Sequence, residues 1–357
     1  MIKQQGDTVS IDFLIKQQEG IETVNNYFLS ICIPSYNRPE TLLRLLRTID
    51  TEADDVQIVI CEDMAPKRLE VRAAVEEFKK ETKYAVKYIE NEVNKGFDWN
   101  VRDFITQADG EYNMYMGDDD GFIPGALDQM IDFLRQHREL GYVMRSSMGW
   151  DGELMKYYPS TTFFEPGMRA YTELYRKSVF ISGFTYKREW AKASMTDKFD
   201  GTLLYQLFIL GEICLNHPSA YFDVPISHNY PSTGEFFFGA SKKEQGRYVP
   251  GKISARGQLV FIESYLVISR YLDDKYGIDS TRLIKRDISK YAYPILAWVQ
   301  RVGRVEMLKC ALGMIKLGLG CSIYFYVYVI GLLLVGRKLC DKIIRRIKDA
   351  MKSTPHL

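Results

Sequence analysis

The chain has 357 residues, enough for one large domain with an extension or for two ordinary domains with buried cores. Hydrophobic residues make up 46% of the sequence, which excludes a disordered chain. The 47 Lys and Arg residues nearly balance the 46 Asp and Glu residues, so no overall positive field exists to attract nucleic acid, and no nucleic acid partner is expected.

Six cysteines are scattered along the chain without a C-x-x-C pair or the spacing of a zinc finger. The N-terminus lacks the basic start and apolar run of a signal peptide, so a reducing, cytoplasmic setting is expected. Cys32 and Cys61 lie in apolar, strand-like stretches, which favours buried structural thiols over reactive ones.

The first 27 residues are polar and weakly patterned and predict an N-terminal arm. From residue 28 onward, apolar runs of strand length alternate with helical patterns. The predicted strands are 28–33, 56–61, 86–89 and 112–116, with helices at 42–49, 69–82 and 100–107 between them. Strands that alternate with helices predict an α/β fold, a mostly parallel sheet with helices on both faces.

Beyond residue 125 the pattern is less regular. We predict a helix to about residue 137, a strand at 142–145, a loop-rich aromatic stretch at 150–175, a strand at 180–186, a helix at 203–210 and a last edge strand at 220–225. A Gly-rich, lysine-bearing loop at 232–251 is long enough to act as a lid, and the remainder of the chain has a helical pattern.

Three consecutive aspartates, Asp118, Asp119 and Asp120, follow the fourth predicted strand, at the end of a parallel sheet where ligands bind. Because like charges repel, this run is costly unless a cation lies among them. Carboxylate oxygens suit Mg²⁺ or Mn²⁺, which typically also bind substrate phosphates and neutralise a departing diphosphate. The alternative interpretation is a solvated acidic turn that caps the next helix.

Four segments occur in order at the ends of the first four strands: ICIPSYNR, VICED, NKGFDWN and MGDDDGFIPGAL. Together they resemble the family 2 glycosyltransferases, enzymes of the GT-A fold, and especially the bacterial members that build surface polysaccharides. The resemblance is specific over residues 29 to about 134 and weaker to about 230. It makes the acidic-turn interpretation of the aspartates improbable.

The resemblance implies that Pro34, Tyr36 and Arg38 line the nucleotide pocket and that an acid of the second strand contacts the base. Members of the family usually have Asp where this chain has Glu62. Asp63 follows directly, so either residue could serve.

The resemblance also implies a turn near the ribose formed by Asn94 and Gly96, where glycine lets the backbone approach a ligand closely. Asp118 would lie near the ribose or the metal, and Asp120 would be the main metal ligand. Asp119 would turn away and support the loop.

Relatives that invert the sugar use an acid late in the domain as the base that takes the acceptor's proton. The matching segment points to Asp200, with Asp197 in reserve, although Asp200 could instead cap the helix that begins near Thr202. His228 falls where some GT-A enzymes bring a histidine to the metal, and a structural role is the alternative.

Residues 317–336 carry no charge, and their length permits a membrane span. The tail 337–352 is basic, so a single span would contradict the positive-inside tendency. We therefore expect a re-entrant hairpin or a helix in the membrane interface, with the tail on anionic lipid. The alternative is a helix packed on the catalytic domain or on a second subunit.

The predicted domains are an arm (1–27), a GT-A catalytic domain (28–235, with donor side 28–134 and acceptor side 135–235) and a helical membrane-associating extension with its lid loop (236–357). The predicted function is metal-dependent transfer of a sugar from a nucleotide-diphosphate sugar to a polyprenyl-diphosphate-linked saccharide at the cytoplasmic face of the membrane. The alternatives are a nucleotidyltransferase, although no Gly-rich, lysine-bearing loop follows the first strand, and a catalytically degenerate lipid-binding assembly subunit. A homo-oligomer is left open.

Overall fold

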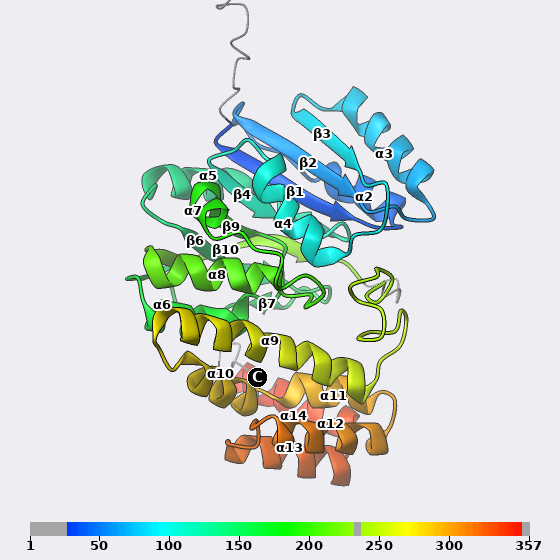
Figure 1. The fold of residues 1–357 in the computed structure, drawn as a ribbon, viewed down its shortest axis with the longest axis vertical. Helices are drawn as coiled ribbons and strands as arrows, with labels where there is room; N and C mark the ends of the chain where they lie inside the picture. Colours follow the sequence, from blue (N-terminus) through cyan, green and yellow to red (C-terminus); the bar gives the residue numbers. More distant parts are fainter. Residues whose placement is uncertain (1–26, 232–236, 352–357) are drawn as a thin grey trace, which may run out of the picture.

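The computed structural model describes residues 27–231 and 237–351, so the predicted N-terminal arm lies outside the described residues. One sheet of ten strands runs through the upper half of the molecule in the order β3-β2-β1-β4-β9-β6-β10-β5, with β7 paired to β6 and β8 to β10 (Figure 1). The strands are β1 (Leu29–Ser35), β2 (Val56–Glu62), β3 (Ala85–Glu90), β4 (Tyr112–Tyr115), β5 (Asp120–Phe122), β6 (Tyr142–Met148), β7 (Leu154–Met155), β8 (Thr162–Phe164), β9 (Phe184–Lys187) and β10 (Ser219–Asn229).

The sheet is mixed and mostly parallel, as the alternation of strands and helices predicts in outline. Strands β3, β2, β1 and β4 run parallel, and β10 is parallel to β6. Strands β9, β5, β7 and β8 are antiparallel to their neighbours. The carboxyl ends of β1, β2 and β4 therefore meet at one edge, where the polar loops predicted from the sequence also lie.

Two expectations for the second half of the domain are wrong. The strand expected at the sheet edge, β10, lies between β6 and β5, because the short β5 after the aspartates pairs with its far end. The stretch expected to be loop-rich holds β7, β8 and helix α6. Its many aromatic residues obscure the period of a helix, and β7 and β8 are too short to show alternation.

Helices cover both faces of the sheet, because alternate residues of each strand face opposite sides. Residues 27–231 contain α2 (Pro39–Leu46), α3 (Arg68–Glu81), α4 (Phe97–Gln107), α5 (Ala126–Gln136), α6 (Met168–Tyr175), the 3₁₀ turn η1 (Arg176–Ser178), α7 (Arg188–Ala193) and α8 (Tyr205–Asn216). Helices α2, α3 and α5 share one core cluster with the sheet, and α4, α6, α7 and α8 share the other.

The C-terminal helices extend the second of these clusters. They are α9 (Ala255–Tyr276), α10 (Ser280–Lys290), α11 (Tyr293–Gln300), α12 (Arg304–Lys316), α13 (Ile323–Leu334) and α14 (Arg337–Met351), stacked below α8 in Figure 1. Helix α8 is buried along nearly its whole length, because the sheet lies on one side and α9 on the other. Leu272 of α9 and Phe325 of α13 belong to the same core as Phe208 of α8.

In the described part of the chain, no helix is both long and apolar enough to cross a membrane. The uncharged stretch 317–336 is interrupted near Gly318, which has a φ of +83°, and continues as α13. That helix has 12 residues, or about 18 Å at 1.5 Å per residue, against a hydrocarbon core of about 30 Å.

We expect Leu272→Ala to lower the free energy of unfolding by about 2 to 5 kcal/mol, because Leu272 is fully buried between α8 and α9. Val267→Ala on the same helix is the control, since Val267 is 42% exposed, and it should cost less than about 1 kcal/mol. Urea denaturation followed by circular dichroism measures both. If both variants lost the same amount of stability, the packing of Leu272 against α8 would be contradicted.

Candidate active site

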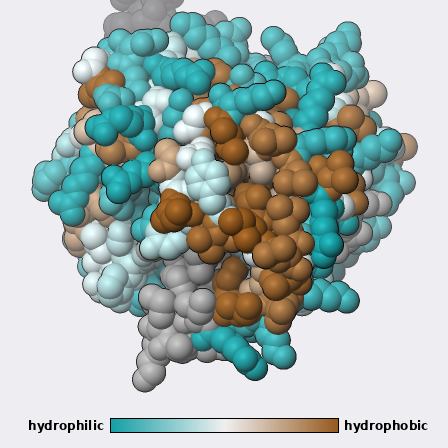
Figure 2. All heavy atoms as spheres, turned by 90° about the horizontal axis from the view of Figure 1, so that it is seen from below, coloured by the Kyte–Doolittle hydropathy of each residue, from teal (hydrophilic) through white to brown (hydrophobic). Residues whose placement is uncertain are grey.

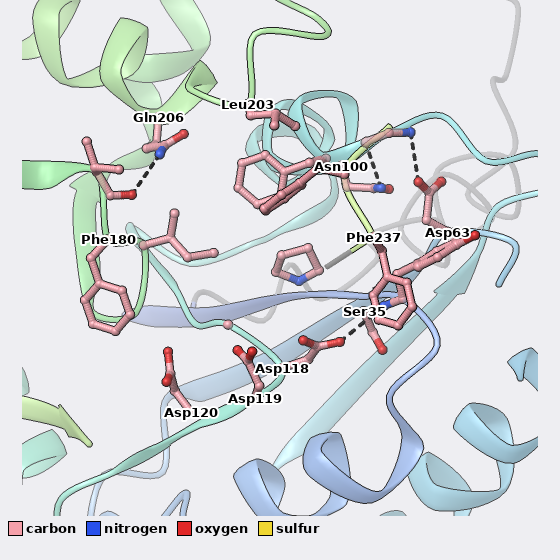
Figure 3. Close-up of a pocket in the computed structure, with 18 of the residues that line it drawn as sticks. Ser35, Asp63, Asn100, Asp118, Asp119, Asp120, Phe180, Leu203, Gln206 and Phe237 are labelled. Carbon is pink, nitrogen blue, oxygen red and sulfur yellow. Dashed lines mark hydrogen bonds between the residues drawn. The ribbon is translucent and has the colours of Figure 1, made fainter. Parts of the chain in front are cut away.

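A cavity of about 580 Å³ opens at the carboxyl ends of β1, β2 and β4. In the view of Figure 3, Asp63 and Phe237 lie at one end, Gln206 and Phe180 at the other, and the three aspartates along one side between them. The predicted site residues that line the cavity are Pro34, Tyr36, Arg38, Asp63, Asn94, Gly96, Asp118 and Asp120. Glu62, Asp200 and His228 do not line it.

Asp118 joins the loop after β1 to the loop after β4. Its carboxylate accepts hydrogen bonds from the backbone N–H of Tyr36 at 3.2 Å and from Nη1 of Arg38 at 2.8 Å. The same Nη1 lies 3.1 Å from Oδ2 of Asp119. Burial raises the pKa of Asp118 to about 6 although Arg38 opposes the shift.

Asp120 is held by the loop that precedes β9. The hydroxyl of Ser182 donates to Oδ2 of Asp120 at 2.5 Å and accepts the N–H of Gly117 at 2.9 Å. Burial, followed by the repulsion of Asp119, raises the pKa of Asp120 to about 7. Asp118 and Asp120 are therefore desolvated carboxylates on one wall of the cavity, with the guanidinium of Arg38 beside the first.

This donor set fits Mg²⁺ or Mn²⁺, which need only one or two carboxylates when substrate phosphates complete the coordination. Over residues 27–231 and 237–351, no group of three or more His, Cys, Asp or Glu side chains is placed to hold a metal. His228 lies in β10 opposite Gly121, with its ring 5.0 Å from that of Tyr230. The assignment of metal ligands stays a prediction.

The structure separates the two acids that follow β2. Asp63 lines the cavity and accepts the N–H groups of Lys95 and Gly96, each at 2.8 Å, so it holds the predicted ribose turn. Glu62 is fully buried and accepts the N–H groups of Met64 and Ala65. Of the two residues left open by the sequence, Asp63 is the one that a bound base could reach.

Gly96 has a φ of +93°, and a Cβ there would lie 2.6 Å from Oγ of Ser241 and 2.8 Å from Oε1 of Glu244. Only glycine fits both this backbone conformation and the close approach of Ser241 and Glu244 from the predicted lid. Glu244 accepts the N–H of Phe97 at 3.1 Å and the N–H of Gly239 at 2.8 Å. These bonds fasten the described part of the predicted lid to the N-terminus of α4.

From the described part of this lid, two aromatic residues, Phe237 and Phe238, line the cavity together with Ala240 and Glu244. The ring of Phe237 lies 5.4 Å from that of Tyr36, and the guanidinium of Arg38 lies 5.2 Å from its centroid. Lys242 and Lys243 of the same loop are exposed and do not line the cavity. Residues 232–236 of the predicted lid lie outside the described residues.

Residues 30–193 match the protein family described as Glycosyl transferase family 2. The chain contains a family 2 glycosyltransferase domain. The resemblance inferred from the four strand-end motifs is thereby confirmed, and the match extends beyond the region where the motifs are specific.

Two curated proteins are similar to parts of this chain. The abequosyltransferase RfbV of Salmonella typhimurium is 27% identical over 126 residues, which cover 34% of this chain and 37% of the relative. An uncharacterized glycosyltransferase of Haemophilus influenzae is 23% identical over 116 residues, covering 32% of this chain and 37% of the relative. The chain thus spans little more than a third of the length of either relative.

Two solved structures are similar to most of the chain, each at a TM-score of 0.49 and 13% identity. S. aureus TarS 1–349 in complex with UDP-GlcNAc is matched over 85% of this chain and 91% of its own. The mannosyltransferase PcManGT from Pyrobaculum calidifontis, in complex with GDP-Man and Mn²⁺, is matched over 88% and 80%.

Asp200, predicted as the catalytic base, lies outside the cavity lining of the family 2 domain. Its carboxylate pairs with Arg102 of α4 through two hydrogen bonds, at 2.9 Å and 3.2 Å. The Asp side chain is 7% exposed and the Arg side chain 18%. This geometry gives Asp200 a structural contact, and its role as base stays a prediction.

The sequence did not single out the residues at the far end of the cavity. Those residues are Tyr157, Arg176, Lys177, Val179, Phe180, Ile181, Leu203, Gln206 and Phe261. They come from four separate segments that approach one another only in the folded chain. Leu203 carries the one local anomaly, a φ of +63°, which sequence does not reveal in a non-glycine residue.

We expect Asp200→Asn and Arg102→Met each to lower the free energy of unfolding by about 1 to 3 kcal/mol. The first removes the charge and one acceptor oxygen of the pair, and the second leaves the buried Asp200 without its two hydrogen bonds. The double variant should lose little more than either single variant, as expected for two residues that act through one contact. Donor binding should persist in Asp200→Asn, and its turnover separates the two roles, since retained turnover is expected if Asp200 acts only through its contact with Arg102. Lost turnover with unchanged stability and donor binding would instead support Asp200 as the base.

Proposed function

We propose that the chain is a metal-dependent glycosyltransferase that moves a sugar from a nucleotide-diphosphate sugar to a hydroxyl of a saccharide acceptor. The observation that carries the proposal is the order of groups along one cavity. Aromatic rings and Asp63 lie at one end, the three aspartates come next, and a further compartment lies beyond them. A nucleotide, a diphosphate with its metal and a sugar are bonded in the same order.

The chain's own residues would bind and orient the donor. Tyr36 and Phe237 present rings to a base, Asp63 offers its carboxylate to the nucleoside, and Gly96 lets the backbone approach the ribose. Asp118 and Asp120 would hold Mn²⁺ or Mg²⁺. When bound, the ion would neutralise the negative charge on the departing diphosphate.

In the reaction, an acceptor oxygen attacks the anomeric carbon while the bond from that carbon to the diphosphate oxygen breaks. A carboxylate takes the acceptor's proton, and a single displacement inverts the configuration. Ser182 fixes Asp120, and Arg38 fixes Asp118, before substrate arrives. This preorganisation avoids a reorganisation cost during the reaction.

We expect purified protein with Mn²⁺ to release nucleoside diphosphate slowly from one of a panel of UDP-, GDP- and dTDP-linked sugars. Asp120→Ala should lower the rate by at least about 100-fold, because several kcal/mol of charge stabilisation depend on the ion. Asp132→Ala, at an exposed position of α5, is the control and should retain full activity. If no donor in the panel binds or turns over, the proposed transfer from these nucleotide-diphosphate sugars is refuted.

We further propose that the enzyme works at a membrane surface, on an acceptor carried by a polyprenyl diphosphate. The molecule seen from the end that carries the C-terminal helices shows hydrophobic side chains gathered on one face (Figure 2). We call this the C-terminal apolar face; its members on α12 and α13 are Leu312, Ile315, Ile323, Tyr324, Val327, Ile330 and Leu334, each between 41% and 76% exposed. Soluble monomers rarely expose so large an apolar patch without a partner.

Charge favours anionic lipid as the partner of this face. Helix α14 follows α13 directly and exposes Lys338, Lys342, Arg345 and Arg346, along with the apolar Leu339 and Ile343. A short helix of exposed apolar and tyrosine side chains beside a basic amphipathic helix is typical of a surface that lies in the membrane interface. On one side α13 buries Phe325 and Leu332 in the core, so its exposed residues cannot turn inward.

We expect the full chain to sediment with vesicles that contain phosphatidylglycerol and much less with vesicles of phosphatidylcholine alone. Ile323→Glu with Ile330→Glu should abolish sedimentation, because charged side chains would have to enter the apolar layer. Leu69→Glu on α3, where Leu69 is 66% exposed, is the matched control. The opposite outcome has two parts: the wild-type chain does not bind vesicles, and it forms dimers that the double variant does not form. That result would assign the C-terminal apolar face to contact with a second subunit.

A further inference from the structure

The compartment beyond the aspartates is walled mainly by apolar side chains. Val179, Phe180 and Ile181 form one part of the wall, with Leu203 and Phe261 as further lining. Leu203 is held in its left-handed conformation by Asp98, which accepts the N–H of Leu203 at 2.7 Å and that of Tyr205 at 2.9 Å. A strained residue fixed by a buried carboxylate keeps this part of the wall in place.

One buried polar group in this wall has unused hydrogen-bonding capacity. Gln206 is 1% exposed, and its Nε2 donates to the carbonyl oxygen of Val179 at 3.0 Å. Its Oε1 has no hydrogen-bond partner among the described residues. Rotating the amide would set two oxygens against each other, so the bond to Val179 leaves Oε1 as a hydrogen-bond acceptor.

The two cations of this compartment are largely occupied. Lys177 donates to Oη of Tyr158 at 2.6 Å and to Glu173 at 3.1 Å. Arg176 donates through Nε to Asp287 at 2.5 Å, and its Nη2 has no partner in the described part of the chain. Among the described residues, the wall therefore presents the unpaired Oε1 of Gln206 as an acceptor and the unpaired Nη2 of Arg176 as a donor.

We propose that this compartment binds the transferred sugar, that the sugar is a deoxysugar, and that Gln206 accepts a hydrogen bond from one of its remaining hydroxyls. The inference rests on the proposed function, which places the nucleotide at Asp63 and the diphosphate at the aspartates, so that the sugar falls in this compartment. A fully hydroxylated sugar would press hydroxyls without partners against Val179, Ile181 and Leu203, which is unfavourable. Where a hydroxyl is replaced by hydrogen, the same wall gives favourable apolar contact.

The class of sugar is tested by binding to the full-length protein with Mn²⁺, measured by calorimetry. The probes are UDP-glucose, GDP-mannose and dTDP-glucose, each compared with the 6-deoxy counterpart on the same nucleotide. We expect the deoxy member of the pair with the preferred nucleotide to bind at least about five-fold more tightly, because burying an unpaired hydroxyl is costly. Equal or tighter binding of the hydroxylated member would overturn the assignment.

The role of Gln206 is tested with Gln206→Met, which keeps the length of the side chain and removes the acceptor. We expect the preferred nucleotide sugar to bind about 3- to 10-fold more weakly and the free nucleoside diphosphate to bind as before. Gln300→Met is the matched control, since Gln300 also donates to a backbone carbonyl, that of Leu332, and has an unpaired Oε1, but does not line the cavity. Equal weakening of both ligands would make Gln206 a structural residue and refute the inference.

The two proposals fail differently. If the wild-type protein binds no nucleotide sugar of the panel, the proposed transfer from these nucleotide-diphosphate sugars is itself wrong. If it binds or hydrolyses a nucleotide sugar, yet Gln206→Met behaves like Gln300→Met, only the assignment of the sugar compartment is wrong.

Discussion

The pocket depends on carboxylates that accept backbone N–H groups from neighbouring loops. Asp118 accepts the N–H of Tyr36, and Asp63 accepts those of Lys95 and Gly96. Each bond joins the end of one strand to a loop that belongs to another. Because a parallel sheet brings these strand ends together without connecting them, the carboxylates determine the distances between loops. Carboxylates that line the cavity therefore also hold its loops together.

Because these carboxylates both line the cavity and hold its loops, negative charge is concentrated in the pocket. Burial raises the pKa of both Asp118 and Asp120, and Arg38 compensates only part of the negative charge nearby. Unliganded, the aspartates are held by hydrogen bonds from Tyr36, Arg38 and Ser182. The aspartate carboxylates repel one another, and these hydrogen bonds compensate only part of that repulsion. A bound cation would remove more of it. The site is thus shaped in advance for positive charge.

That the residues at the Asp63 end line one cavity could be predicted from sequence, because they lie within a few positions of strand ends. Pro34, Tyr36 and Asp118 follow apolar runs whose type and order the sequence shows clearly. Gln206 and Arg176 could not be predicted in this way. Each lies in a segment whose local pattern is that of an ordinary helix or turn, and long-range packing alone brings it to the cavity.

The order of the strands in the sheet also could not be predicted from the sequence. The short β5 carries no alternation of its own and follows charged residues, yet its pairing with β10 turns an expected edge strand into an interior one. Asp200 shows the same limit for a single residue. Its position before a helix suggests a catalytic acid or a cap, and only the fold reveals Arg102 across from it.

The continuous core from α8 to α13 constrains how the chain can be divided. Phe208, Leu272 and Phe325 belong to one cluster, although they lie on both sides of the predicted boundary at residue 235. Truncation at residue 235 would expose the apolar side of α8, and the fragment would then be prone to aggregate. An inactive, aggregated fragment would give no information about catalysis. Chimeras that exchange sugar specificity between relatives should therefore carry α8 and α9 together. For this chain, the segment that must be exchanged as one piece is larger than residues 29 to about 134, which the motifs mark.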